Sequence, residues 1–336
     1  MFELNQHKTQ ALYFQPSYAR LEERICKAAP DLDIALIDEE GQVTFKGKPI
    51  SAKSLHPDYF WIHSEMFASP FLKEYFRMML EYHEVKWLHT VSTGLDMGPY
   101  RELLNHNIRI TNNHSQAIAI AEFVMGQVLS WFQNLPDYAQ SQKLRNWKYR
   151  PFREIHQSRW LIIGFGHIGQ QIARRAKAFG VHITAVRRSR DDAGLADTVC
   201  TLETMESELQ AADVVVLACT SNDGTRDLVD KTFLSNMKAE SVLINIARGD
   251  LVVEEDLRNA LDAEGSLAHV ILDVFRQEPL TEDAWFWNHP AVTMTPHCSN
   301  GGSGMRQRSD DLFIENLYRI SNGQLLLNEV SEKYFV

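Results

Sequence analysis

Short β-branched runs alternate with segments of helical period from about residue 158 onward. The runs are RWLII (159–163), HITAV (182–186), DTVC (197–200), DVVVLAC (213–219), SVLINIA (241–247), HVILDVF (269–275) and AVTMTP (291–296). Several are apolar almost throughout, so helices should cover both of their faces. Between the first two runs, apolar residues recur on one helix face: Ile168, Ile172, Ala173 and Ala176. The pattern predicts a doubly wound α/β unit with a parallel sheet.

The N-terminal part shows the same alternation of strand-like runs and helical segments, but less regularly. Its predicted strands are DIALID (33–38), YFWIHS (59–64) and VKWLHTV (85–91), and a helix is predicted over 71–82. The last segment, 305–336, begins with a helical pattern. We therefore expect a second, smaller α/β domain, against which the C-terminal segment packs.

One long apolar stretch, SQAIAIAEFVMGQVLSWFQNL (115–135), has a helical period. Gln116, Glu122 and Gln127 lie in its first half, so a buried connecting helix is favoured over a membrane span. The segment after it, 136–157, alternates polar and aromatic residues, and we interpret it as an arm or linker.

Composition narrows the classes of function. The chain has 336 residues, of which 44% are hydrophobic and 23% charged, as in folded globular proteins. A formal net charge of −10 argues against nucleic-acid and anionic-membrane partners, because both need a basic surface. The N-terminus shows no export signal, so a cytoplasmic location is expected. The four cysteines are scattered without metal-ligand spacing, so no metal site is expected.

The sequence LIIGFGHIG places Gly164, Gly166 and Gly169 in GxGxxG spacing, directly after a strand and at the start of a helix. The first glycine permits a tight turn, the second lets the backbone approach a pyrophosphate, and the third allows close packing of helix on strand. A glycine-rich turn without a ligand is the alternative. The strand before and the helix after favour a dinucleotide site formed by six residues: Gly164, Phe165, Gly166, His167, Ile168 and Gly169.

The next predicted strand ends in ITAVRRSR (183–190), where NAD-binding folds usually have an acidic residue that binds the ribose 2′-hydroxyl. Arg187 occupies this position, followed by Arg188 and Ser189. A guanidinium can pair with a 2′-phosphate, which an aspartate would repel. The sequence therefore favours NADP(H) over NAD(H). Because Arg190 continues the basic run, a solvated turn is the alternative.

Three further motifs follow predicted strands at the same edge of the sheet: NIARGDLVVEEDL (245–257), LDVFRQEPL (272–280) and MTPHCSN (294–300). With the glycine loop, they have the order and spacing of the D-isomer-specific 2-hydroxyacid dehydrogenases, which the chain resembles over about 85–330. The resemblance implies an α/β fold in which a Rossmann dinucleotide-binding domain (115–300) is inserted in a smaller flavodoxin-like substrate domain (1–114 and 301–336). It also implies an oxidoreductase, and with the arginine pair an NADP(H)-dependent reductase of small 2-oxo acids such as glyoxylate or hydroxypyruvate.

The resemblance assigns roles to three residues. Reduction of a 2-oxo acid needs a cation for the substrate oxygens, an acid for the new alkoxide and a group that tunes that acid. Arg248 matches the family's substrate-binding arginine, His297 its general acid and Glu278 the carboxylate that bonds the other imidazole nitrogen. Separations of 30 and 19 residues leave room for one strand each, so the three can converge from successive strand ends.

Further site residues come from the same resemblance. Cys219, Ala247 and Asp273 are cofactor-binding candidates, although Cys219 stands where the family commonly has proline, and Asp273 could instead be a strand-end cap. Ser92, Thr93 and Gly94, within VSTGLD (91–96), are candidates for binding the substrate carboxylate, or form an ordinary turn. With Arg248 and His297 they make the predicted substrate site. The segment 111–122 is about one residue short of the family spacing, so Asn112 and Asn113 receive no role.

Several alternatives remain at this point. A dinucleotide-sensing, corepressor-like interaction protein could use the same fold, and a formate dehydrogenase-like enzyme usually has glutamine at the position of Glu278. Trp285 and Trp287, in TEDAWFWNHP (281–290), could wall the substrate pocket or pack in a core or interface. The helix at 115–135 and the arm at 136–157 suggest a homodimer, as relatives form.

Overall fold

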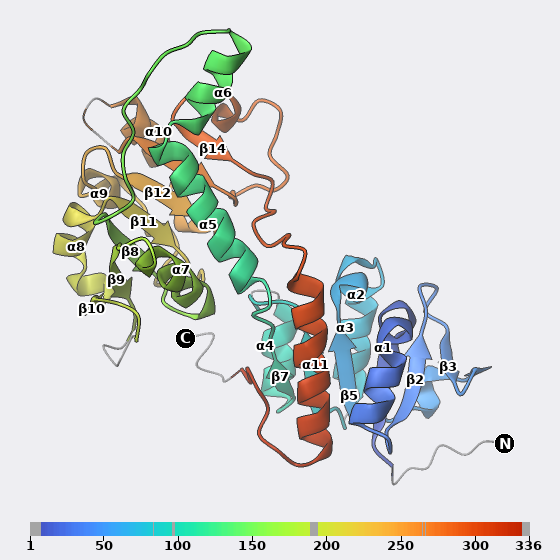
Figure 1. The fold of residues 1–336 in the computed structure, drawn as a ribbon. Coiled ribbons are helices and arrows are strands. Elements are labelled where there is room, and N and C mark those ends of the chain that lie inside the picture. Colours follow the sequence, from blue (N-terminus) through green and yellow to red (C-terminus); the bar gives the residue numbers. More distant parts are fainter. Residues whose placement is uncertain are drawn as a thin grey trace. The chain divides into compact units, whose positions relative to one another are not determined.

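The computed structural model describes residues 8–82, 84–95, 98–188, 194–263, 265 and 267–330. The chain divides into two compact units, unit 1 (1–115 with 306–336) and unit 2 (116–305). Each unit contains a seven-stranded sheet with helices on both faces (Figure 1). The predicted two-domain α/β fold is confirmed.

Unit 1 has the strand order β4-β3-β2-β1-β5-β6-β7. The five strands from β2 to β7 in this order are parallel and follow the flavodoxin-like 2-1-3-4-5 arrangement, to which β3 and β4 add an antiparallel edge. Its strands are β1 (Gln10–Phe14), β2 (Asp33–Ile37), β3 (Val43–Phe45), β4 (Lys48–Pro49), β5 (Tyr59–Ile62), β6 (Trp87–Thr90) and β7 (Arg109–Thr111). Its helices are α1 (Gln15–Ala28), α2 (Ser64–Ala68), α3 (Leu72–Glu81), α4 (Gly98–Asn105), α11 (Met305–Ser321) and a short 3-10 helix (Ala52–Ser54).

The alternation of side chains along the strands builds two cores in unit 1. On one face, residues such as Leu12 and Phe60 pack against α2, α3 and α4. On the other, Tyr13 and Trp61 pack against α1 and α11, and the Trp61 ring stacks on Phe313 with 3.9 Å between ring centroids. The C-terminal segment therefore packs on the N-terminal sheet, as its helical pattern predicts.

A cluster of charged side chains around the buried His63 and Asp310 fixes the first turns of α11. His63, which follows β5, contacts Asp310 through Nε2 at 3.2 Å and Glu65 through Nδ1. Arg20 pairs with Asp310, and Arg306 pairs with Glu65. Burial opposes the imidazolium charge, but hydrogen bonds to Asp310 and Glu65 outweigh it and raise the pKa of His63 above its ordinary value. The cluster joins α1, α2 and α11 at one end of the unit 1 sheet.

Unit 2 has the strand order β10-β9-β8-β11-β12-β13-β14, and all the pairings between these strands are parallel. This is the doubly wound 3-2-1-4-5-6 order with one further strand. Its strands are β8 (Arg159–Ile163), β9 (His182–Val186), β10 (Thr198–Cys200), β11 (Val214–Leu217), β12 (Val242–Asn245), β13 (His269–Leu272) and β14 (Val292–Met294). Its helices are α5 (Ala117–Phe132), α6 (Leu135–Lys143), α7 (His167–Lys177), α8 (Glu206–Ala211), α9 (Lys231–Ser235) and α10 (Glu254–Asp262). Three short 3-10 helices are Leu202–Thr204, Gly249–Leu251 and Trp285–Asn288.

Helices α5 and α7 lie side by side on one face of the unit 2 sheet (Figure 1). The other face packs against α8, α9 and α10. Consecutive strand residues alternate between these two cores, for example Leu161 and Ile162 of β8. Among the described helices, none combines the length and apolar character needed to cross a bilayer.

The predicted arm, 136–157, is partly helical. Residue Asn134 adopts a left-handed conformation, and α6 follows from Leu135 to Lys143 with Pro136 in its first turn, where proline is tolerated. Residues 144–157 carry no helix or strand. The segment interpreted as an arm or linker is therefore helical in its first half and irregular in its second.

Candidate active site

Most of the predicted site residues in unit 2 follow the carboxyl ends of its parallel strands. Gly164 follows β8, Arg187 follows β9, Asp273 follows β13, and Arg248 and His297 come three residues after the ends of β12 and β14. The strand order reverses between β8 and β11. Open α/β sheets bind ligands at such a switch point, outside the carboxyl ends of the strands.

The three glycines of the GxGxxG loop differ in the room that surrounds them for a Cβ atom. Gly164 has φ +93°, and a Cβ there would lie 2.5 Å from the backbone of Cys219. A Cβ at Gly169 would lie 2.4 Å from the carbonyl oxygen of Gly164. A Cβ at Gly166 meets no described protein atom within 4 Å. Packing within the protein therefore accounts for the first and third glycines, and the middle one faces open space, as approach by a ligand requires.

The loop fits a dinucleotide pyrophosphate in a second respect. Gly166 is the N-cap of α7, whose first residue is His167, and the N–H groups of a first helical turn have no carbonyl partner within their own helix. Phe165 is buried in the unit 2 core, and Ile168 packs against the same core. These two side chains anchor the loop to the sheet, whereas His167 between them is exposed.

The arginine pair lies at the end of β9. The Arg187 N–H donates to the carbonyl of Cys200 at 3.0 Å, which continues the pairing of β9 with β10 by one residue. The Arg187 side chain is half-buried and Arg188 is exposed. Ser189 and Arg190, the other members of the predicted basic run, lie outside the described residues.

His297 and Glu278 form a close pair. The imidazole Nδ1 lies 2.7 Å from Glu278 Oε2, and the other carboxylate oxygen accepts the Phe275 N–H at 2.9 Å. The side chains are 45% and 35% exposed, so both can be reached by a bound molecule. Because Nδ1 is engaged by the carboxylate, Nε2 is the nitrogen that can exchange a proton with a substrate.

Asp273 fixes the segment that carries His297. Its carboxylate is fully buried and accepts hydrogen bonds from Thr295 Oγ1 at 2.6 Å, from the Cys298 N–H at 2.9 Å and from the Ser299 N–H at 3.0 Å. The His297 N–H donates to the Asp273 carbonyl at 2.9 Å. This geometry is that of a strand-end cap. A contact between Asp273 and the nicotinamide stays a prediction.

Arg248 is held by its own loop. The Arg248 carbonyl accepts a hydrogen bond from the Asn245 side chain at 2.8 Å, and Arg248 Nη1 donates to the Ala247 carbonyl at 2.7 Å. Asn245 Oδ1 also accepts the Ala247 N–H at 3.0 Å, and Asn245 is fully buried. Sequence reasoning missed Asn245, although a polar residue near the end of an apolar run was a usable signal.

Cys219 packs beside the glycine loop. Its backbone is the group that excludes a Cβ at Gly164. Burial raises the pKa of the Cys219 thiol to about 11, so the side chain is neutral at physiological pH. Cysteine at the position where the resemblance expects proline therefore adds no charge to the loop.

The predicted substrate loop in unit 1 is held by two asparagines. Asn112 Nδ2 donates to the Thr93 carbonyl at 2.9 Å, and the Asn113 N–H donates to the Ser92 carbonyl at 3.1 Å. Thr93 Oγ1 donates to the Asn113 carbonyl at 2.5 Å. Asn112 and Asn113 thus position Ser92, Thr93 and Gly94, a role that sequence reasoning did not assign. Asp96, the last residue of the motif, lies outside the described residues.

The aromatic stretch at 281–290 packs within unit 2. Trp285 stacks on Phe286 with 4.1 Å between ring centroids, and Arg258 of α10 lies over its ring at 5.9 Å. Trp287 donates from Nε1 to the Thr281 carbonyl at 2.8 Å. These contacts favour the packing interpretation for Trp285.

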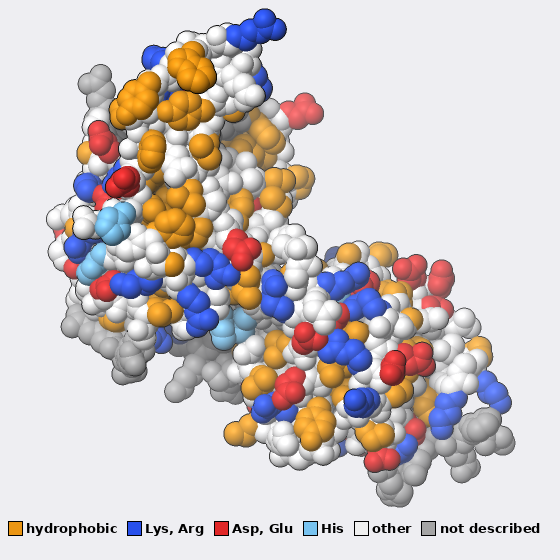
Figure 2. Space-filling view, viewed as in Figure 1, with side chains coloured by type: hydrophobic (Ala, Val, Ile, Leu, Met, Phe, Trp, Pro, Cys, Tyr) orange, Lys and Arg blue, Asp and Glu red, His pale blue; other side chains and the backbone are white. Residues whose placement is uncertain are grey.

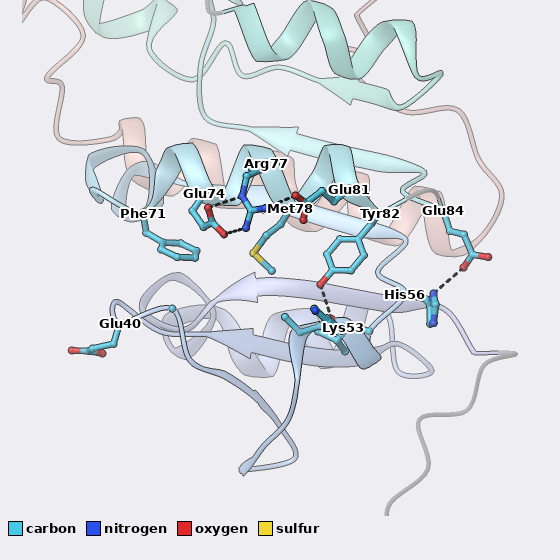
Figure 3. A pocket seen from close by; sticks show the side chains of 13 residues that line it. Glu40, Lys53, His56, Phe71, Glu74, Arg77, Met78, Glu81, Tyr82 and Glu84 are labelled. Carbon is cyan, nitrogen blue, oxygen red and sulfur yellow. Dashed lines mark hydrogen bonds and ion pairs between the residues drawn. The ribbon is translucent and has the colours of Figure 1, made fainter.

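A cavity of about 730 Å³ lies in unit 1 beside α3 (Figure 3). Phe71, Met78 and Tyr82 contribute its apolar lining, while Arg77 lies between Glu74 and Glu81 and pairs with both. None of the predicted site residues lines it. Among the described residues, no group of three or more His, Cys, Asp or Glu side chains is arranged to hold a metal ion.

Known proteins resemble this chain in sequence. The family model described as "D-isomer specific 2-hydroxyacid dehydrogenase, NAD binding domain" matches residues 125–299. Glyoxylate/hydroxypyruvate reductase A of Klebsiella pneumoniae (strain 342) is 32% identical over 212 residues, which cover 63% of this chain and 67% of the relative.

Solved structures resemble it over nearly the whole chain. A D-isomer specific 2-hydroxyacid dehydrogenase family protein from Aeromonas salmonicida superposes with a TM-score of 0.76 at 27% identity, covering 97% of this chain and 99% of that one. A D-isomer specific 2-hydroxyacid dehydrogenase from Xanthobacter autotrophicus Py2, solved with NADPH and MES, has a TM-score of 0.78 at 22% identity with the same coverage.

Proposed function

The chain belongs to the family of D-isomer-specific 2-hydroxyacid dehydrogenases, and we propose that it reduces a small 2-oxo acid of the glyoxylate or hydroxypyruvate type to the D-2-hydroxy acid with NADPH. The observation that carries the proposal is the His297–Glu278 pair at 2.7 Å, on strand-end segments that neighbour the loop of Arg248. The name of the Klebsiella relative supports the choice of substrate.

The residues divide the chemistry between them. A bound reduced dinucleotide supplies the hydride. The Arg248 guanidinium binds the substrate carboxylate and polarises the 2-oxo group, which stabilises the negative charge that develops on its oxygen. His297 donates the proton from Nε2 to that oxygen, and Glu278 orients the imidazole and stabilises its protonated form. In the reverse reaction His297 acts as the base.

A steady-state assay tests this function. The purified chain is supplied with NADPH or NADH and a panel of 2-oxo acids that includes glyoxylate, hydroxypyruvate and pyruvate. We expect turnover of at least one small 2-oxo acid. Dinucleotide binding without turnover of any of them would contradict the proposal and favour a dinucleotide-sensing interaction protein.

The preference for NADP(H) should depend on Arg187. We expect Arg187→Asp to lower the ratio of kcat/KM for NADPH to kcat/KM for NADH by about tenfold or more. A charge-assisted hydrogen bond contributes about 1.5–3 kcal/mol, and 1.4 kcal/mol corresponds to a factor of ten. Arg258→Asp, an exposed arginine on α10, makes the same change of charge away from β9 and should leave the ratio unchanged. Equal ratios in wild type and Arg187→Asp would show that the arginine does not select the cofactor.

We also propose that the chain forms a homodimer through the arm. The arm exposes large apolar side chains, among them Leu144, Trp147, Tyr149 and Phe152. Hydrophobic side chains gather over α5 and α6 in the view of Figure 2. Exposed apolar surface of this kind is typical of a protein–protein interface.

The dimer can be tested by size-exclusion chromatography with light scattering. Trp147→Glu should shift the protein toward the monomer at micromolar concentration, because a buried unpaired carboxylate opposes association. Tyr318→Glu alters an exposed aromatic residue of α11 and should leave the mass unchanged. A monomeric wild-type protein would overturn the proposal.

A further inference from the structure

The Arg276 side chain makes an unusual set of contacts in the loop that follows β13. Its Nε donates to the carbonyl of Val252 at 2.6 Å, and Nη2 donates to the carbonyl of Asp250 at 3.3 Å. Nη2 also pairs with the Asp227 carboxylate. One guanidinium therefore satisfies two main-chain carbonyls of the segment that begins one residue after Arg248.

The backbones of the two loops also touch directly. A Cβ at Gly249 would lie 1.9 Å from the carbonyl carbon of Phe275 and 2.3 Å from the Arg276 nitrogen. Only glycine allows this approach. The Arg276 N–H donates to Glu254 Oε1 at 3.0 Å, which adds a contact between the Arg276 loop and the first turn of α10.

The Arg276 loop also carries Glu278. The Phe275 N–H binds Glu278 Oε1 at 2.9 Å, and Oε2 holds His297 at 2.7 Å. Arg276 thus lies between the loop of Arg248 on one side and the Glu278–His297 pair on the other. A shift of the loop at Arg276 would move both.

From these contacts we propose that Arg276 is a positioning residue that sets the spacing between Arg248 and the Glu278–His297 pair. This inference rests on the proposed function, since it takes the three residues as the substrate-binding and proton-transfer groups. Arg276 itself acts through the main chain of 249–253. Planar, multidentate hydrogen bonding to fixed acceptors is what a guanidinium does and an ammonium cannot reproduce.

An ordinary surface ion pair is the competing interpretation. The side chains of Arg276 and Asp227 are 35% and 50% exposed, and an exposed ion pair contributes little to stability. Arg226 provides a matched comparison, because its Nη1 pairs with the Asp250 carboxylate at 3.0 Å in the same neighbourhood. If only surface charge matters, removing either arginine should have the same small effect.

The test compares Arg276→Met with Arg226→Met in the full-length protein. Amide hydrogen exchange is measured at 249–253 and 275–279, and kcat and KM are measured over a range of pH with NADPH and the best 2-oxo acid. For Arg276→Met we expect faster exchange in both segments. We also expect kcat to fall by about tenfold while the KM for NADPH stays within about twofold of wild type. Small misplacements of reacting groups slow the reaction more than they weaken binding.

The outcomes separate this inference from the proposed function. Wild-type exchange and wild-type kinetics in Arg276→Met, or equal effects from Arg226→Met, would overturn the positioning role. A wild-type protein that reduces no 2-oxo acid would overturn the proposed function, and exchange in the two segments would then still report whether Arg276 ties the loops.

Discussion

Replacing His297 with asparagine should lower kcat for reduction of a 2-oxo acid by about 10²- to 10⁴-fold, the range for loss of a general acid. The new alkoxide needs a proton as it forms, and water is a poorer donor than an imidazolium held by a carboxylate. Binding of NADPH should change little, because His297 lies after β14 and the glycine loop follows β8. Single-turnover reduction of the 2-oxo acid, followed by NADPH absorbance, measures the effect.

His289 is a matched control for this substitution. It lies in the same unit and contacts a carboxylate as His297 does, with Nε2 3.2 Å from Asp262. His289→Asn should leave kcat within about twofold of wild type, because the contacts of His289 with Asp262, Ala291 and Trp285 involve none of the proposed catalytic residues. A His297→Asn variant that keeps more than a tenth of wild-type kcat would show that another group donates the proton.

The strands of unit 2 could be predicted because they are apolar on both faces. All the residues of β11, β12 and β13 are buried, and only Asn245 and His269 among them are polar, so the sequence shows almost continuous apolar runs. The predicted strands are longer than the observed ones because side chains stay buried beyond the last residues that pair with a neighbouring strand. Ile246 and Ala247 are buried in the loop that follows β12, and a hydrophobic run does not show where strand pairing stops.

Strand β1 and helix α1 were not predicted, and for β1 there is a physical reason. The first residue of β1, Gln10, is polar yet buried, and its environment is supplied by residues far along the chain. Its N–H donates to Asp58 Oδ2 at 2.8 Å, and its Oε1 accepts the His56 N–H at 3.1 Å. Hydrogen bonds across more than 40 residues leave no local pattern in the sequence.

The same limit applies to the site. Residues with their own chemistry, such as Arg248 and His297, were named from motifs. Other residues that orient their neighbours, such as Asn113 and Arg276, received no role because that role lies in contacts between distant segments. Asn113 Nδ2, for example, donates to Ser309 Oγ at 2.8 Å across 196 positions. Arg276 stands inside a recognised motif, but its partners at 227, 250 and 252 come from elsewhere in the chain.

The dinucleotide site can be tested by two glycine substitutions with opposite expected effects. In Gly166→Val the side chain enters open space at φ −79°, so folding should lose no more than about 1 kcal/mol, the scale of a changed N-cap. The same side chain would occupy the space that a pyrophosphate needs. We expect NADPH binding at least tenfold weaker, a loss of about 1.4 kcal/mol, with a nearly unchanged unfolding temperature.

Gly164→Val should behave in the opposite way, because both its strain and its clash arise within the protein. A φ of +93° is unfavourable for valine, and the Cβ would lie 2.5 Å from the Cys219 backbone. Backbone strain and overpacking each cost about 1–3 kcal/mol, so the free energy of unfolding should fall by about 2–6 kcal/mol. Calorimetry and fluorescence titration with NADPH measure both variants. If Gly166→Val binds NADPH as wild type does, the pyrophosphate does not lie against this loop, and the assignment of unit 2 as the dinucleotide-binding domain loses its main support.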